Sequence, residues 1–556
     1  MNKGSLELLA ILAISICFSA GINPSLQAQP AIQWKKALGG TEGEIAYAVA
    51  RTNDNGYVVA GETNSTDGDV HGNPRGRAAW IVKLNSGGDT VWTRVLGASS
   101  GQGTSANAVA STSDGGYIVA GSDVSDNTIS LDMWVAKLDS NGRIVWTRKL
   151  GGNGEDGARG VIQTADGGYI VAGYTMSNDG DGYGNHGASD FLVVKLNTVG
   201  DRVWVRTLGG SNMDDAWSVT DAGDGGCVVA GETQSTDGDV HGNHDTTHQY
   251  PDFWVVKLNS DGDTVWTKTL GGSGYDQALS VTRAADGGFV VVGQTYSTDG
   301  DVQGNHGSAD FWVVKLSSDG AIVWTKTLGG DGADLATSVI QSTDGSYVVA
   351  GFTYSTTQTD SGNFPNGDVL KNKGQSDYWI VKLNSDGEKI WTKALGGSLT
   401  DCAWSIVQTD DSPNLGYVVV GYVSSGDSDV AGSGYHSGYF TADDYWVVRL
   451  GGDLPAHPLS VSGNPKSLPA HFELHQNYPN PFNPATSIHY DVPRASHVTL
   501  RIFDILGREV RTLVNQDLRA GSYNIQWDAG MAPSGVYFYR LTGDNFVGTK
   551  KLVLMK

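Results

Sequence analysis

Two aspartates and an asparagine recur with the same spacing in four polar segments of the sequence. Carboxylates two residues apart, an amide oxygen close by and glycine-permitted backbone carbonyls are hard oxygen ligands of the kind that Ca²⁺ prefers. Calcium is therefore the cofactor that these segments predict. The second interpretation is that Asp-Gly and Gly-Asn pairs form tight turns, and the bidentate glutamate that completes an EF-hand loop is absent. The candidate ligands are Asp67, Asp69 and Asn73; Asp179, Asp181 and Asn185; Asp237, Asp239 and Asn243; and Asp299, Asp301 and Asn305.

Other chemical signals in the sequence are weaker. His241, His244 and His248 could hold a transition metal, but they share one irregular segment without zinc-ligand spacing. Residues 97–101 (GASSG) and 152–157 (GNGEDG) match a nucleophile elbow and a dinucleotide loop in spacing only, because no helix follows either segment. We therefore predict no catalytic residue. A carboxylate pair for glycoside hydrolysis stays open, because the separation of two carboxylates is a three-dimensional matter.

One sequence motif is repeated along residues 34–450. The fold that these repeats form must position all of the segments described above. In residues 275–330 the motif contains four strand-sized segments, rich in Val, Trp, Phe and Thr and bounded by Asp-Gly or Gly-Gly turns. No helix-length amphipathic stretch interrupts them. Four antiparallel strands in a unit this short describe the blade of a β-propeller, so we predict an all-β fold with a seven-bladed propeller over residues 31–450.

The order of the repeated segments predicts how the ring closes. Each copy of the repeat contains its first, second and third strand segments in order. The tryptophan of the fourth strand, however, first occurs at Trp34, before the first copy, and no fourth-strand tryptophan follows Leu450. A ring must fasten its last blade to its first, so residues 31–38 are expected to complete the seventh blade. This arrangement leaves no exposed sheet edge at the seam.

Most of the 16 tryptophans follow the repeat, at the third and fourth strands of the copies. Periodic placement predicts core packing, in which each buried aromatic contributes on the order of 2–3 kcal/mol. A ligand platform is expected instead among the non-periodic aromatics of the long loops, such as Tyr183, Tyr250 and Tyr435.

The N-terminus is typical of an exported protein. Lys3 precedes an apolar run over residues 8–18, which is long enough for a signal-peptide core and too short to span a bilayer. We predict a signal peptide over residues 1–28, and Ile16 before Cys17 argues against lipidation. Only Cys227 and Cys402 then remain, so a disulfide framework is not expected to stabilise the chain. No other apolar run is long enough for a transmembrane helix, and we expect no membrane anchor.

The charge balance narrows the class of partner. Residues 1–469 contain 28 Lys and Arg against 53 Asp and Glu, within a formal net charge of −23 for the whole chain. Such a segment repels nucleic acid and anionic lipid, so neither is an expected partner. We expect a monomer.

The repeat stops at residue 451, and a different organisation follows. Residues 451–469 carry Pro and Ser and are predicted to be a linker. Residues 470–556 contain strands that alternate polar and apolar residues, which predicts a small immunoglobulin-like β-sandwich.

Four segments of this C-terminal part carry a resemblance: residues 477–484 (NYPNPFNP), 503–510 (FDILGREV), 534–541 (SGVYFYRL) and 550–556 (KKLVLMK). Together they closely resemble the type A C-terminal sorting domain of the type IX secretion system. The resemblance implies recognition by that machinery, passage through the outer membrane of a Bacteroidetes-like bacterium, and removal of the domain near its N-terminal side. The released protein is then secreted or attached to surface polysaccharide. The repeats resemble, more loosely, the Trp and Leu-Gly-Gly repeat arrays of such secreted proteins.

These features together predict an exported, cell-surface or secreted propeller that is non-catalytic and serves in binding or adhesion. The expected ligand is a glycan or a protein, and the acidic charge favours neutral or cationic targets. Two alternatives stay open: a secreted enzyme, for example one that degrades polysaccharide at an unrecognised site on one propeller face, and a structural or assembly element of the cell surface.

Overall fold

The computed structural model of the 556-residue chain describes most of it, including both repeated and C-terminal regions. The predicted signal peptide, residues 1–28, lies outside the described residues, as do residues 453–468 of the predicted linker. The described ranges are 29–73, 76–97, 103–124, 130–245, 247–355, 368–369, 372–410, 415–436, 443–452, 469, 471–482, 485–494, 496–518, 521–529, 532–544 and 546–555.

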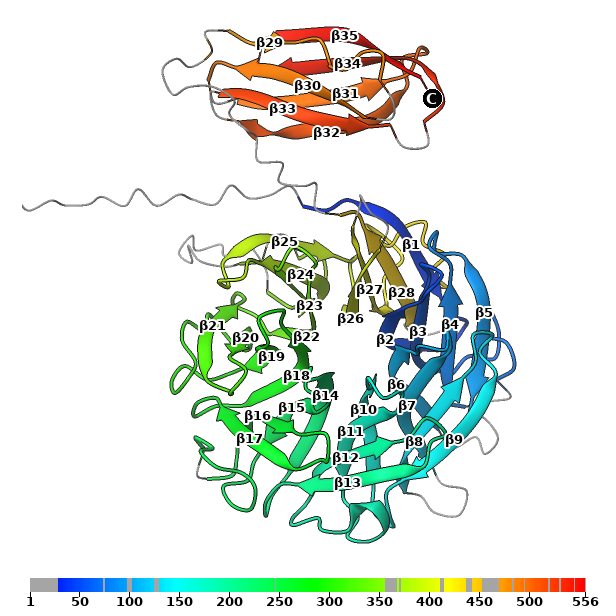
Figure 1. Cartoon of the computed structure of the whole chain (residues 1–556), viewed down its shortest axis with the longest axis vertical. Helices are drawn as coiled ribbons and strands as arrows, with labels where there is room; N and C mark the ends of the chain where they lie inside the picture. Colours follow the sequence, from blue (N-terminus) through cyan, green and yellow to red (C-terminus); the bar gives the residue numbers. More distant parts are fainter. Residues whose placement is uncertain are drawn as a thin grey trace, which may run out of the picture.

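Seven four-stranded antiparallel sheets form a ring, with the first strand of each sheet innermost (Figure 1). The prediction of a seven-bladed propeller is therefore confirmed. Blades one to three contain β2 (Glu44–Arg51), β3 (Tyr57–Thr63), β4 (Ala78–Leu84) and β5 (Thr90–Leu96); β6 (Thr104–Ser111), β7 (Tyr117–Val124), β8 (Leu131–Leu138) and β9 (Ile144–Leu150); and β10 (Asp156–Gln163), β11 (Tyr169–Thr175), β12 (Asp190–Leu196) and β13 (Arg202–Leu208). Blades four to six contain β14 (Asp214–Asp221), β15 (Cys227–Thr233), β16 (Asp252–Leu258) and β17 (Thr264–Leu270); β18 (Asp276–Arg283), β19 (Phe289–Thr295), β20 (Asp310–Leu316) and β21 (Ile322–Leu328); and β22 (Asp334–Gln341), β23 (Tyr347–Thr353), β24 (Asp377–Leu383) and β25 (Lys389–Leu395).

Blade seven closes the ring with a strand from the start of the propeller. It contains β26 (Asp401–Gln408), β27 (Tyr417–Val423), β28 (Asp444–Leu450) and β1 (Ile32–Leu38), in the sheet order β1-β28-β27-β26. β1 pairs antiparallel with β28, from Ile32 opposite Leu450 to Leu38 opposite Tyr445. The closure predicted from the shifted tryptophan series is confirmed.

The core lies between neighbouring blades, because each sheet is covered on both faces. Every residue of β3, β4 and β20 is buried. At each of five blade contacts, a third-strand tryptophan packs against the aromatic ring of the preceding blade, as with Phe253 and Trp312, whose ring centroids lie 4.5 Å apart. The other four pairs are Phe191 with Trp254, Phe311 with Trp379, Tyr378 with Trp446, and Tyr445 with Trp80. Cys227 and Cys402 are free, buried thiols.

The fourth-strand tryptophans differ from the expectation of a common core. Trp391 is fully buried, but the other six, at Trp34, Trp92, Trp146, Trp204, Trp266 and Trp324, are half-buried. The fourth strand is the outermost in each blade, so one edge of the indole faces solvent. The other face covers a glycine in the turn between the third and fourth strands of the next blade: a Cβ on Gly88 would lie 2.8 Å from the Trp34 ring.

The C-terminal region is a β-sandwich, as the alternating pattern predicts. One sheet has the order β29-β30-β33 and the other β32-β31-β34-β35, and one hydrophobic core packs them together. β32 was not among the strands that the sequence indicated. Among the described residues no helix is long and apolar enough to cross a membrane, and the helical element there is the short η1 (Gly180–Gly182). The sandwich strands are β29 (Glu473–Leu474), β30 (Ala485–Val492), β31 (Ser496–Phe503), β32 (Glu509–Leu518), β33 (Gly521–Asp528), β34 (Gly535–Gly543) and β35 (Phe546–Leu554).

Candidate binding site on the propeller axis

The four Asp-Gly-Asp segments lie between second and third strands, at the end of each sheet where the chain enters from the preceding blade. Their first aspartate accepts backbone hydrogen bonds from that entering turn: Asp299 Oδ1 lies 2.7 Å from the Ser273 nitrogen. Asp67, Asp179 and Asp237 do the same for Thr41, Asn153 and Ser211. These carboxylates therefore already have a role in holding the turn that precedes their blade.

The other two residues of each segment are also hydrogen-bonded. The second aspartate accepts from the first glycine of the same turn, as in Asp239 Oδ2 to the Gly209 nitrogen at 3.2 Å. Asp69, Asp181 and Asp301 repeat this bond with Gly39, Gly151 and Gly271. The Asn73 side-chain amide donates to the Ser65 carbonyl in its own loop, and those of Asn185, Asn243 and Asn305 donate to the carbonyl of the last residue of the preceding strand. The contacts support the turn interpretation, and calcium binding at these twelve residues stays a prediction.

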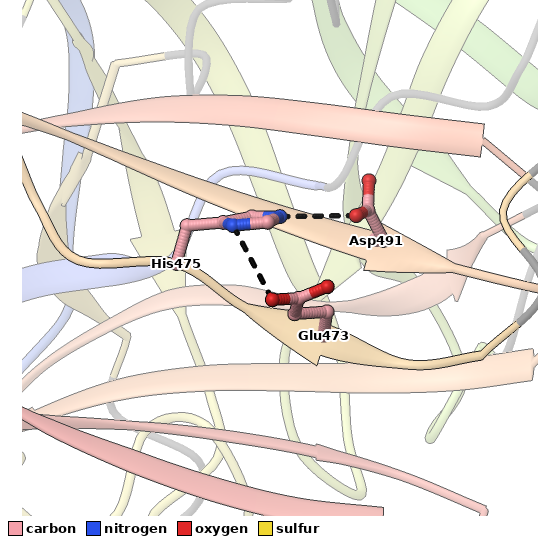
Figure 2. Close-up of side chains that lie close together, drawn as sticks. All are labelled: Glu473, His475 and Asp491. Atoms are coloured by element: carbon pink, nitrogen blue, oxygen red, sulfur yellow. Dashed lines mark hydrogen bonds and ion pairs between the residues drawn. The ribbon is translucent and has the colours of Figure 1, made fainter.

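In the C-terminal sandwich the described residues place the ligand atoms of three metal-type side chains within 4.8 Å of one another. His475 Nε2 lies 3.0 Å from Asp491 Oδ2 and its Nδ1 lies 3.7 Å from Glu473 Oε1 (Figure 2). Both ring nitrogens thus face a carboxylate, and Glu473 is exposed. This arrangement is an ion-pair cluster between β29 and β30, and it lies far in sequence from His241, His244 and His248.

A residue in each of the seven innermost strands is turned out of the strand pairing by a β-bulge. The register shifts at the same position in every blade, for example between Ala216 and Ser218, which leaves Trp217 unpaired. The glycine opposite explains why: a Cβ on Gly231 would lie 2.0 Å from the Asp215 carbonyl oxygen, so only glycine permits this close approach. The bulged residues are Tyr47, Asn107, Arg159, Trp217, Leu279, Thr337 and Trp404.

These seven residues form what we call the axial ring, because neighbouring innermost strands contact each other around the centre of the propeller (Figure 1). Tyr47 and Trp404 meet edge to face across the closure seam, with ring centroids 5.8 Å apart. The Arg159 guanidinium lies 4.4 Å from the centre of the Trp217 ring, a cation–π contact. Except for the buried Thr337, all members of the axial ring are half-buried.

Two carboxylates beside the axial ring, Glu232 and Asp215, have a raised pKa. Glu232 accepts hydrogen bonds from Trp217 Nε1 at 3.2 Å and from Gln277 Nε2 at 2.7 Å. Burial raises the pKa of Glu232 above its usual range, although these hydrogen bonds oppose the shift. Burial likewise raises the pKa of Asp215, against the effect of Arg159.

Two polar groups of the axial ring are not satisfied within the described part of the chain. Arg159 Nε and Trp404 Nε1 are buried atoms without a hydrogen-bond partner there. An unsatisfied buried donor costs about 1–3 kcal/mol. The axial ring therefore has two donors that a ligand could satisfy.

The axial ring is where the blades differ most. The residue before each bulge is alanine in all seven blades, and the opposing second-strand residue is always glycine, whereas the seven bulged residues comprise six different types. Packing fixes the first two positions and leaves the bulged position free. Sequence reasoning missed this site because it counted Trp217 and Trp404 as core. A comparison of the copies position by position could have found it.

The loop aromatics that were expected to form a ligand platform do not share one arrangement. Tyr183 is 79% exposed and Tyr250 is 41% exposed. Tyr435 instead packs against the core and donates a hydrogen bond to the Ser424 carbonyl at 2.9 Å.

Comparison with known proteins identifies the C-terminal sandwich. Residues 476–555 match the model of the secretion system C-terminal sorting domain, as the four motifs of that region predict. A regulatory protein, FlaEY of Caulobacter vibrioides, is 26% identical over 211 residues, which are 35% of this chain and 22% of that protein. The chain thus spans about a fifth of that relative.

Solved structures give only distant likenesses. A puromycin hydrolase has a TM-score of 0.39 at 13% identity, covering 84% of this chain and 62% of the hydrolase chain. An apocarotenoid oxygenase of Synechocystis has a TM-score of 0.33 at 11% identity, covering 68% of this chain and 97% of the oxygenase. Scores this low assign no activity.

The fold and the sorting domain define the class of this protein: an exported β-propeller protein. Its C-terminal sorting domain directs it to the cell surface or the extracellular space and implies interaction with the type IX secretion machinery.

Proposed function

We propose that the propeller is a non-catalytic binding domain whose axial ring holds a neutral glycan. The observation that carries the proposal is the variation at the bulged position: in blades that otherwise repeat, Tyr47, Trp217 and Trp404 place three large aromatics where packing does not require them. Aromatic rings offer an apolar face to a sugar ring, and the hydrogen-bonding groups beside them fix its orientation.

The charges near the axial ring favour a neutral ligand over an ionic one. Arg77 pairs with Glu62 at 2.5 Å, and Arg159 faces Asp215. Burial raises the pKa of Glu232, which disfavours its negatively charged form. A peptide ligand is the competing occupant, and it becomes an outcome of the test.

A glycan array with the complete secreted chain tests the proposal, followed by calorimetric titration of the glycans that bind. Trp217→Ala and Trp404→Ala should each weaken binding at least about tenfold, which corresponds to about 1.4 kcal/mol. Tyr183→Ala removes an equally aromatic but exposed loop side chain and should leave the affinity unchanged.

Three results would contradict the glycan assignment. Absence of any glycan binding, or binding lost with Tyr183→Ala and kept by both tryptophan variants, would remove the axial ring from the proposal. Capture of a peptide by the same ring would replace the glycan. Cleavage of a bound glycan, seen as new products by mass spectrometry and lost with Asp215→Asn, would favour the secreted-enzyme alternative.

A further inference from the structure

Two buried carboxylates face each other at five of the seven junctions between blades. One begins the third strand of a blade and the other begins the first strand of the next blade, and all ten side chains are fully buried. The pairs are Asp190 with Asp214, Asp252 with Asp276, Asp310 with Asp334, Asp377 with Asp401, and Asp444 with Glu44.

The first glycine of the connecting Leu-Gly-Gly turn lies between the two carboxylates. A Cβ on Gly271 would lie 2.4 Å from Asp252 Oδ1 and 2.6 Å from Asp276 Oδ2. The corresponding distances at Gly209 are 2.5 Å from Asp190 Oδ1 and 2.6 Å from Asp214 Oδ2. Gly39, Gly329 and Gly396 repeat the geometry at the other three junctions. At each junction the two acidic oxygens therefore lie beside the same glycine.

At least one oxygen of each pair has no hydrogen-bond partner in the described residues, and the Asp310–Asp334 pair has two, because Asp334 Oδ1 is unsatisfied as well. Asp276 is satisfied by Ser297 Oγ at 2.7 Å and by the Gly272 nitrogen at 2.9 Å. Asp252 Oδ2 is satisfied by His244, whose Nδ1 lies 2.7 Å away, but Asp252 Oδ1 is buried with no hydrogen-bond partner in the described residues. The same oxygen is unsatisfied in Asp190, Asp310, Asp377 and Asp444.

A third carboxylate lies in the loop near each pair, but in the described residues the three side chains do not bring their oxygens within 4.8 Å of one another. Asp301 Oδ2 accepts from the Gly271 nitrogen at 3.4 Å, and its charge raises the pKa of Asp252, for which burial is the largest cause. Asp239, Asp368 and Asp429 act in the same way on Asp190, Asp310 and Asp377. At the seam, Asp69 bonds to Gly39. Lys389 and Lys373 pair with Asp368 and Asp429, yet Asp310 and Asp377 keep their unsatisfied oxygen.

The two remaining junctions act as internal controls. Between blades one and two, both acids are absent together: Ala78 and Thr104 take their places. Between blades two and three, Asp132 and Asp156 are kept, but Lys149 Nζ lies 3.9 Å from Asp132 and Arg202 lies 2.5 Å from Asp181. Asp132 has no buried oxygen left unsatisfied in this part of the chain. The acids thus either disappear as a pair or the chain supplies cations for them.

We propose that each of the five junctions binds one Ca²⁺, which draws together the third-strand aspartate, the first-strand acid of the next blade and the second loop aspartate. Buried carboxylates that face each other without a cation are costly, and a hard divalent ion with several oxygen ligands removes that cost. The sites join successive blades, so the ions stabilise the ring. The first loop aspartates, such as Asp299, and the loop asparagines are not ligands.

Equilibrium dialysis of ⁴⁵Ca²⁺ against the complete secreted chain, stripped with EGTA, measures the number of sites. The expected stoichiometry is about five per chain, with a rise in melting temperature on adding Ca²⁺. Asp252→Asn should lower the stoichiometry by about one. Asp299→Asn and Asp132→Asn should leave it unchanged, although both also replace an aspartate of the same region.

The outcomes separate this proposal from the loop sites predicted from the sequence. Loss of one ion with Asp299→Asn and none with Asp252→Asn would assign calcium to the loops and overturn the junction sites. No bound calcium at millimolar concentration would mean that protons neutralise the pairs, and an equal thermal shift with Mg²⁺ at matched ionic strength would mean that divalent ions act without a calcium site; either result overturns the proposal. If Asp252→Asn loses its native circular dichroism spectrum, Asp310→Asn makes the same test at another junction.

Discussion

Deletion of residues 32–38 tests how much the closing strand contributes to the ring. β1 contributes Ala37, at 3% exposure, and Leu38, at 7%, to the cores on the two sides of blade seven, together with half-buried Ile32 and Trp34. Burial of a leucine is worth about 1.5–3 kcal/mol and a half-buried tryptophan about 1–1.5 kcal/mol. With Ala37, Ile32 and the backbone pairs included, we expect a loss of roughly 5 kcal/mol or more, against a typical total stability of 5–15 kcal/mol.

Urea unfolding of the truncated and complete chains measures this loss, and a synthetic peptide of residues 29–40 should restore part of it by pairing with β28. The freed edge of β28 should also promote dimers in size-exclusion chromatography. Leu208 provides a matched control, because it is equally 7% exposed at the same position of a blade that is covalently continuous. Leu38→Ala and Leu208→Ala should each cost about 2–5 kcal/mol. An unchanged unfolding midpoint for the truncation, or a neutral Leu38→Ala beside a costly Leu208→Ala, would refute the closure energetics.

Three further predictions concern export, the bulge and the axial acid. Removal of residues 470–556 should leave a folded propeller inside the cell envelope, and undiminished extracellular protein after cell fractionation would count against the sorting role. Gly231→Ala puts a Cβ 2.0 Å from the Asp215 carbonyl, so the bulge must be lost; we expect about 3 kcal/mol or more of destabilisation by urea unfolding, and a smaller cost would show that the bulge adapts. Because the folded-state pKa of Glu232 is raised, its stabilisation is present below the unfolded pKa and is lost as pH rises through the folded pKa. Glu232→Gln should therefore gain stability relative to the parent at pH 8 more than at pH 5 in parallel thermal melts, and an equal difference at both pH values would contradict the raised pKa.

The strands could be predicted because their signals are local and repeated. The apolar residues and flanking turns of residues 310–316 predict a strand, and β20 spans those residues. The number of blades and the closure followed from counting copies. The sandwich strand β32 was missed because its Arg, Asn, Gln and Asp residues interrupt the apolar alternation.

The sites could not be predicted in the same way, because they depend on contacts between distant segments. Asp190 and Asp214 each begin a strand, and nothing local shows that the two carboxylates meet at Gly209. Trp217 occupies a strand whose period-two alternation predicts a buried face, but the bulge turns the residue out of the pairing. The half-buried fourth-strand tryptophans were assigned to the core for a related reason: periodicity shows that a position is structural without showing how much solvent reaches it.

The repeat itself separates structural from functional positions in this protein. The positions equivalent to Gly231 and Ala216 are glycine and alanine in every blade, because the close approach of the first two strands leaves no space for larger side chains. Trp217 is free to differ because the same approach turns it away from the sheet. The paired acids behave in a third way, because both are present at six junctions and both are absent at the seventh, where Ala78 and Thr104 replace them. A position that differs between blades independently of its neighbours, as the bulged position does, is expected to contact an external ligand. Two positions that change together, as the paired acids do, are expected to interact with each other or to share an ion.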